Sequence, residues 1–143
     1  MKKTTIILSI IAVIAAVIIT VNIFKKDSKD KETSKNYIEN KDGTKVNTSE
    51  DIKKDKEVEG IKIQKQSLIY SNGSSKLISN ITNTTSETKT VSFKIFFIDE
   101  TGQVIIEALG YVGNVMPGET RQLDSEITTD VSNAKDVKYE VIK

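Results

Sequence analysis

The sequence contains no cysteine, no histidine and no tryptophan among its 143 residues, and only one proline. Without cysteine the chain can form neither a disulfide nor a thiolate metal site, and it offers no thiol for lipid attachment. Without histidine it lacks the commonest general base, the commonest metal ligand and the side chain best suited to sensing pH near neutrality. These absences exclude the catalytic and metal-dependent classes that rely on the two residue types.

An excess of charge of one sign is also missing. Twenty-one basic side chains face twenty acidic ones, so the formal net charge is +1 at pH 7. This balance gives no bias towards a polyanion or a strongly acidic ligand. We therefore expect no nucleic-acid partner.

The longest apolar stretch is residues 4–24, which read TTIILSIIAVIAAVIITVNIF and include no charged side chain. At a helical rise of about 1.5 Å per residue this stretch spans roughly 31 Å, which is the thickness of the hydrocarbon core of a bilayer. Lysine pairs flank it at residues 2–3 and 25–26. The pattern predicts a transmembrane helix over 4–24 that contacts the lipid bilayer, with residues 1–3 as a short cytoplasmic end.

A cleaved signal peptide is the alternative interpretation of this stretch, and it would release a secreted domain. The apolar part of a signal peptide covers about 7 to 15 residues and ends at a small-x-small cleavage site. Here the apolar run is longer, and Thr20 to Phe24 are poor substrates for the peptidase. The sequence therefore favours a retained anchor.

Charge alone leaves the orientation of this anchor undecided. Two lysines precede the span and five follow it closely, so a count of basic residues places the long C-terminal part in the cytoplasm. The lysines after the span are interleaved with Asp27, Asp30 and Glu32, although acidic residues count for little in that rule.

Residues 25–57 are rich in charged side chains and poor in apolar ones. Their apolar side chains are limited to Tyr37, Ile38, Val46 and Ile52, which show neither a helical nor a strand period. Burial of so few apolar groups does not offset the entropy lost on ordering the chain. The composition predicts a disordered, charged linker.

From Val58 onward, short alternating runs are separated by turn signals, a pattern typical of antiparallel β structure. Asn72-Gly73 predicts a type I′ hairpin turn, and Met116-Pro117-Gly118-Glu119 predicts a type II turn. The expected strands cover residues 58–70 (one long strand or two short ones broken near Lys65), 76–83, 90–99, 103–109, 121–127 and 137–142. Six or seven strands without a convincing amphipathic helix predict one antiparallel β-sandwich over 58–143, with a small open barrel as the alternative.

Three short motifs in this part of the chain resemble those of a known family. They are Leu77-x-Ser79-x-Ile81-x-Asn83, the strand and turn from Ile95 to Gly102, and Met116-Pro117-Gly118-Glu119-Thr120. Their order and spacing are similar to those of the FxLYD domain, a small Ig-like β-sandwich of exported and membrane-anchored bacterial proteins. The resemblance covers residues 60–142.

This chain departs from the family pattern at several positions. When the two are aligned on Asp99, Ile95, Phe97 and Ile98 stand where the family has Phe, Leu and Tyr, and Ser79 stands where it has Gly. The resemblance implies an extracytoplasmic domain, and hence a cytoplasmic amino terminus. It implies no catalytic role.

Two patterns contain residue types that could support chemistry. Ser-x-x-Lys occurs at residues 28–31, 86–89 and 132–135, but it activates a serine only where a helix sets the two side chains one turn apart in a pocket. None of these lies on a predicted helix. Asp99, Glu100 and Glu107 form a carboxylate cluster that is typical of a turn, with weak calcium binding as the alternative. We predict no catalytic residue, metal site or cofactor.

The strand over residues 90–99 is apolar on both faces. One face enters the core. The other carries Phe96 and Ile98, which either are covered by a loop or by the segment around Val58, or form an exposed patch for a partner. Phe96 and Ile98 are therefore the candidate partner patch.

Together these features predict a single-span protein of the bacterial cell envelope that carries a non-catalytic binding or scaffolding module. Its partner would be an envelope protein or polymer that the sequence does not identify. One alternative is a small accessory subunit of a membrane complex that acts through its transmembrane helix. The other is an envelope enzyme, which requires a pocket with convergent Asp, Glu, Lys or Tyr groups.

Overall fold

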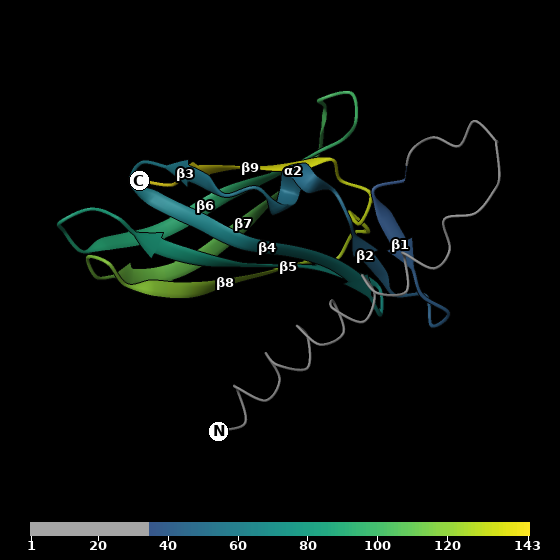
Figure 1. Cartoon of the computed structure of the whole chain (residues 1–143), viewed down its shortest axis with the longest axis horizontal. Coiled ribbons are helices and arrows are strands. Elements are labelled where there is room, and N and C mark those ends of the chain that lie inside the picture. Colours follow the sequence, from purple (N-terminus) through teal and green to yellow (C-terminus); the bar gives the residue numbers. More distant parts are fainter. Residues whose placement is uncertain (1–34) are drawn as a thin grey trace, which may run out of the picture. The chain divides into compact units, whose positions relative to one another are not determined.

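Nine strands and one short helix follow one another along residues 35–143, the part of the chain that the computed structural model describes (Figure 1). The elements are β1 (Tyr37–Glu39), β2 (Lys45–Asn47), α2 (Glu50–Lys53), β3 (Lys56–Val58), β4 (Ile61–Ser71), β5 (Ser74–Asn83), β6 (Lys89–Ile98), β7 (Val104–Val115), β8 (Thr120–Ile127) and β9 (Asp136–Val141). The predicted all-β class is confirmed. The predicted transmembrane segment, residues 4–24, lies outside the described residues.

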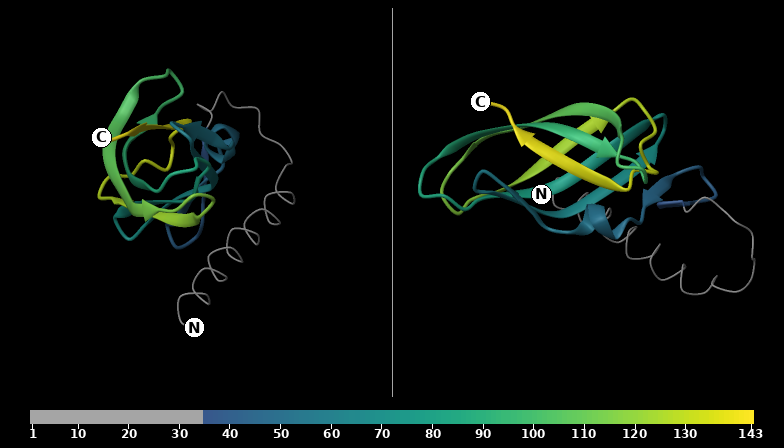
Figure 2. Two further views of the ribbon diagram at one scale, coloured as in Figure 1. Left: turned by 90° about the vertical axis from the view of Figure 1, so that its left-hand side faces the viewer. Right: turned by 90° about the horizontal axis from the view of Figure 1, so that it is seen from above.

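The strands form two antiparallel sheets that enclose one core (Figure 2). In the first, here called the β4 sheet, the strand order is β1-β2-β4-β5-β8, and β3 also pairs with β4. In the second, the β6 sheet, the order is β7-β6-β9, so the most hydrophobic strand is central as predicted. Side chains alternate between buried and more exposed positions along β4, β5 and β6, because successive residues of a strand point to opposite faces.

The predicted turns are confirmed by their backbone angles. Asn72 and Gly73 both have positive φ (52° and 84°), as a type I′ turn requires. Gly118 has a φ of 73°, and the Glu119 N–H donates to the Met116 carbonyl at 3.0 Å, as in a type II turn.

The first long predicted strand is continuous but irregular. Its pairing with β5 shifts between Gln64 and Ser67, and Lys65 within that shift has a φ of 51°. This is a β-bulge at the position where the sequence suggested a break.

The prediction of a disordered linker through Glu57 is wrong for residues 35–57. β1, β2, α2 and β3 all lie in this segment, and Ile52 is only 1% exposed. The Asn47 side-chain amide donates to the carbonyls of Ser132 at 2.7 Å and Ala134 at 2.8 Å. These buried hydrogen bonds stabilise the segment in addition to the burial of Ile52. A count of apolar residues does not detect such hydrogen bonds. The remaining linker residues, 25–34, lie outside the described part.

This N-terminal segment covers one side of β4. β3 pairs with residues 61–63 of β4, β2 pairs with residues 69–70, and α2 lies between them in sequence. A strand edge that would otherwise be open is thereby paired at both ends. Within residues 35–143 no helix has the length and apolar character needed to cross a membrane.

Candidate interaction surfaces

The two residues of the candidate partner patch, Phe96 and Ile98, lie on β6. Ile95 and Phe97 are fully buried, so strand alternation places Phe96 on the side that faces away from the core. Phe96 is half-buried there. Ile98 is only 6% exposed, so it is not part of an exposed patch. Of the two predicted alternatives for this face, burial therefore applies to Ile98, and Phe96 contributes to the surface only in part.

The exposed apolar side chains lie mainly on the neighbouring strand, β7. Large apolar side chains that are well exposed within residues 35–143 are Val104 (54%), Ile105 (42%), Leu109 (69%), Tyr111 (72%), Met116 (60%) and Ile142 (39%). Leu109 is paired with Lys94 and Tyr111 with Ser92, and residues opposite each other in an antiparallel pair share a face. We call Ile105, Leu109 and Tyr111 the β7 strip.

The sequence contains a signal for this strip. Residues 104–112 are apolar at both odd and even positions, as β6 is. A strand that is apolar on both faces needs a cover on each side, and β7 is at the end of its sheet with its outward residues uncovered.

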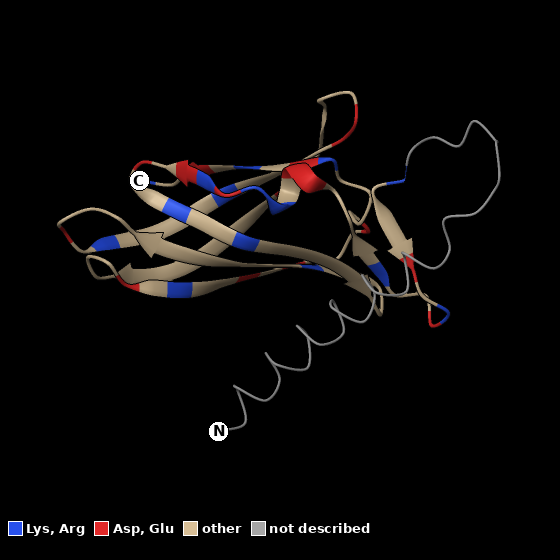
Figure 3. Ribbon diagram, viewed as in Figure 1, with Lys and Arg blue, Asp and Glu red and all other residues tan. Residues whose placement is uncertain are grey.

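Charges of both signs surround the β7 strip. Lys94 lies 3.9 Å from Glu107, and the β9 residues that share this face include Lys138 and Glu140. Figure 3 shows Lys and Arg interspersed with Asp and Glu over the described strands. The surface therefore combines an apolar strip with a mixed polar surround.

Where β7 meets β8, side chains close the gap between the two sheets. The Ser125 hydroxyl donates to the Leu109 carbonyl at 3.1 Å. The Arg121 guanidinium donates to the carbonyls of Asn114 at 2.9 Å and Val112 at 3.4 Å. We call this contact the β7–β8 seam.

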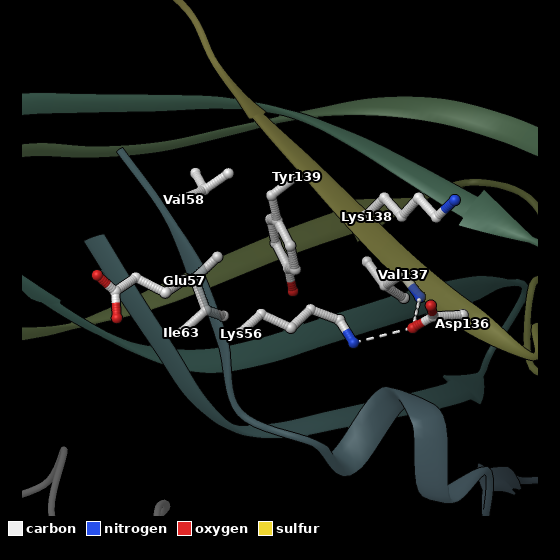
Figure 4. A pocket seen from close by; sticks show the side chains of 8 residues that line it. All are labelled: Lys56, Glu57, Val58, Ile63, Asp136, Val137, Lys138 and Tyr139. Atoms are coloured by element: carbon white, nitrogen blue, oxygen red, sulfur yellow. Dashed lines mark hydrogen bonds and ion pairs between the residues drawn. The ribbon is translucent and has the colours of Figure 1, made fainter. Parts of the chain in front are cut away.

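On the opposite side of the molecule, β3 and β9 are separated by a groove of about 360 Å³ (Figure 4). Its lining consists of Lys56, Glu57, Val58, Ile63, Asp136, Val137, Lys138 and Tyr139. The Lys56 ammonium bridges it by donating to Asp136 Oδ1 at 2.9 Å and to the Asp51 carbonyl at 2.8 Å. We call this space the β3–β9 groove.

Tyr139 extends into the space between β3 and β9 (Figure 4). The hydroxyl donates to Gln66 Oε1 at 2.7 Å, and the Gln66 amide donates to the Lys54 carbonyl at 2.8 Å. Burial raises the pKa of the Tyr139 hydroxyl above its usual range. Ser79 is buried and makes no hydrogen bond within the described residues. Tyr139 therefore stays protonated near neutral pH and acts as a structural donor.

The predicted turn at Asp99 is confirmed. Its Oδ1 accepts hydrogen bonds from the Thr101 hydroxyl at 2.7 Å, the Thr101 N–H at 2.8 Å and the Gln103 N–H at 3.0 Å. These bonds, the one from the Thr101 hydroxyl above all, lower the pKa of the Asp99 carboxyl. Glu107 instead faces Lys94, so the structure does not bring these carboxylates to one site.

The two Ser-x-x-Lys matches that fall within the described residues are not arranged for catalysis. The Lys89 ammonium donates to the Glu59 carbonyl at 2.6 Å, and the Lys135 ammonium lies 3.4 Å from Asp51. The Ser132 hydroxyl donates to Asp130. Within residues 35–143, no three acidic side chains are grouped so as to hold a metal ion.

No protein-family model, curated protein or solved structure matches the sequence. The resemblance to the FxLYD domain therefore stays a prediction.

Proposed function

We propose that this chain is a single-span membrane protein of the bacterial cell envelope, with residues 1–3 in the cytoplasm and a membrane helix over 4–24. Residues 35–143 form an extracytoplasmic, non-catalytic module that binds or scaffolds another envelope component. The uncharged run of 21 residues in the sequence supports the anchor. The three FxLYD-like motifs support the extracytoplasmic orientation and an Ig-like form of the sandwich.

The observation that carries the binding role is the β7 strip. Leu109 and Tyr111 are 69% and 72% exposed, although the core is filled by other side chains. Single exposed apolar residues are common on protein surfaces. Several exposed apolar side chains on one strand, which make little contact with the rest of the domain, are typical of an interaction site.

The surroundings of the strip favour a protein as the partner. Protein interfaces commonly have an apolar, often aromatic centre and a polar rim. Tyr111, Leu109 and Ile105 supply the centre, and Lys94 and Glu107 supply charges of both signs beside it. A partner with a complementary apolar surface would bury the strip.

Protease treatment of intact cells tests the orientation. With a tag after Lys143, trypsin should cleave among the lysines of residues 25–35 and release a resistant fragment that begins close to Lys35. Protection of the whole chain until the cells are lysed would instead place the module in the cytoplasm.

Site-specific photo-crosslinking tests the surface. A crosslinkable amino acid at Leu109 should give a discrete protein adduct in intact cells, whereas the same group at exposed Gln122 on β8 should give none. Adducts of equal yield at both positions would count against the β7 strip as the binding site. The double variant Leu109→Ser with Tyr111→Ser should abolish an adduct formed from Ile105, the third residue of the β7 strip.

A further inference from the structure

Two strand edges line the β3–β9 groove. β9 is an end strand of the β6 sheet, and β3 pairs with β4 on one side only. The groove is lined by all three residues of β3 and by four consecutive residues of β9, from Asp136 to Tyr139. The walls of this groove therefore consist of the unpaired backbone edges of two strands as well as of side chains.

The pairing of β9 shows which backbone groups point towards the groove. The Ile142 N–H donates to the Ser92 carbonyl at 2.9 Å, and in an antiparallel pair the residues that bond to the partner strand alternate with those that do not. The N–H and C=O of Val137, Tyr139 and Val141 therefore point away from β6. The Val137 N–H donates to Asp136 Oδ1 at 2.7 Å, so the groups that stay open are those of Tyr139 and Val141. No hydrogen bond between described residues caps these groups, whereas at the β7–β8 seam Ser125 and Arg121 cap three carbonyls.

We propose that the β3–β9 groove binds an extended peptide segment of a partner protein, which adds to the free edge of β9 as a further strand. Groups two residues apart on one edge of a strand repeat at about 6.8 Å. An extended backbone presents donors and acceptors at this spacing, which is the basis of strand addition. This surface is separate from the β7 strip, and the inference does not depend on the proposed function.

The side chains of the groove define the peptide further. Val58 and Ile63 from one sheet and Val137 and Tyr139 from the other form an apolar floor, which favours an apolar side chain at the central position of the peptide. Within residues 35–143, Glu57 and Lys138 form no ion pair, unlike Lys56, which bonds to Asp136. A peptide with one basic and one acidic residue flanking the apolar position complements these walls.

The chain's own N-terminal part does not have this chemistry. Residues 25–34 read KKDSKDKETS and contain no apolar side chain to fill the floor. This segment therefore does not complement the groove, and we assign the groove to an extended segment of another protein that does.

The probe for the test is the synthetic peptide acetyl-Lys-Thr-Val-Thr-Val-Asp-amide. Its control has the same sequence with alternate backbone nitrogens methylated, which removes the donors of one edge. Both are added at millimolar concentration to the isotope-labelled full chain in detergent micelles, and backbone amide exchange is followed by NMR. The unmodified peptide should slow exchange of the Tyr139 and Val141 amides at least about tenfold, and the methylated peptide should not.

Two variants keep the result interpretable. Val141→Pro removes an N–H that points away from β6, so it should abolish peptide binding while the β6–β9 pairing remains. Lys138→Glu, at an exposed position, should weaken binding at least about fivefold, and exchange of the terminal aspartate of the peptide for lysine should restore it. Unchanged exchange at Tyr139 and Val141, equal binding of the methylated peptide, or protection confined to β7 would each overturn the proposal.

Discussion

The two seams between the sheets are built in opposite ways. At the β7–β8 seam core side chains pack against Gly110, where an added Cβ would lie 2.8 Å from both Ile95 Cδ1 and Leu123 Cδ1, so these methyl groups would have to move. Ser125 and Arg121 then occupy the edge carbonyls of β7. At the β3–β9 groove the Lys56 ammonium bonds to Asp136 and the Tyr139 hydroxyl bonds to Gln66, but the backbone edge of β9 stays open at Tyr139 and Val141. We infer that the first seam mainly serves stability and that the second leaves backbone free for binding.

Gly110→Val should give the largest effect, because the added side chain collides with two core residues at the closed seam. We expect the free energy of unfolding to fall by about 3 kcal/mol. Urea unfolding followed by circular dichroism measures this. Leu109→Val, at the adjacent exposed position, is the matched control and should change stability by less than about 0.5 kcal/mol. A small effect at Gly110 would mean that the seam can open, contrary to the comparison.

Gln66→Ala tests the floor of the groove. Gln66 is 5% exposed and satisfies both the Tyr139 hydroxyl and the Lys54 carbonyl. Its removal leaves the buried Tyr139 hydroxyl without a partner and removes the bond to the Lys54 carbonyl, and we expect a loss of about 2 kcal/mol in the same unfolding measurement. Gln64→Ala, which removes only an exposed hydrogen bond to Asp55, should cost less than about 0.5 kcal/mol. Equal losses of stability in the two variants would show that the buried hydrogen bonds of Gln66 stabilise the fold no more than the exposed bond of Gln64.

Two fully buried serines of β5 should respond in opposite directions. Ser79 has no hydrogen-bond partner among the described residues, so Ser79→Ala should raise the free energy of unfolding by about 1 kcal/mol. Ser75 donates to the Thr129 carbonyl at 2.7 Å and accepts from the Val131 N–H at 3.0 Å. Ser75→Ala should therefore lower it by about 1.5 kcal/mol. Thermal unfolding of the two variants under one buffer condition measures both changes, and a loss of stability in Ser79→Ala would contradict the prediction.

Local patterns in the sequence predicted the strands and turns of the sandwich, except that β7 continues to Val115, beyond the predicted end at Leu109. Asn72-Gly73 and Pro117-Gly118 favour turns through the backbone angles of their own residues. The apolar side chains of β6 likewise mark a strand by their local order. Neither signal depends on distant parts of the chain. The folding of residues 35–57 was missed because Asn36, Asn47 and Ser49 obtain their partners from residues 132–135, about 85 or more positions away. No local pattern reports such a bond.

The candidate surfaces were predicted less well for the same reason. Phe96 lies on the predicted face of the β6 sheet, but its neighbour Ile98 is buried and the exposed residues belong to β7. The groove could not be predicted at all, because it depends on which edges of β3 and β9 remain unpaired once both sheets have formed.

The smallest changes in the free energy of unfolding should come from truncating one side chain at the β7–β8 seam and one at the β3–β9 groove. The Ser125 hydroxyl donates to the Leu109 carbonyl and is 4% exposed, so Ser125→Ala should lower the free energy of unfolding by about 1 kcal/mol. Lys138 on the rim of the groove is exposed and forms no ion pair within residues 35–143, so Lys138→Ala should change it by less than about 0.5 kcal/mol. Urea midpoints measured side by side test both. A loss at Lys138 as large as that at Ser125 would mean that the rim supports the fold, and the edge of β9 would then not be free for a partner strand.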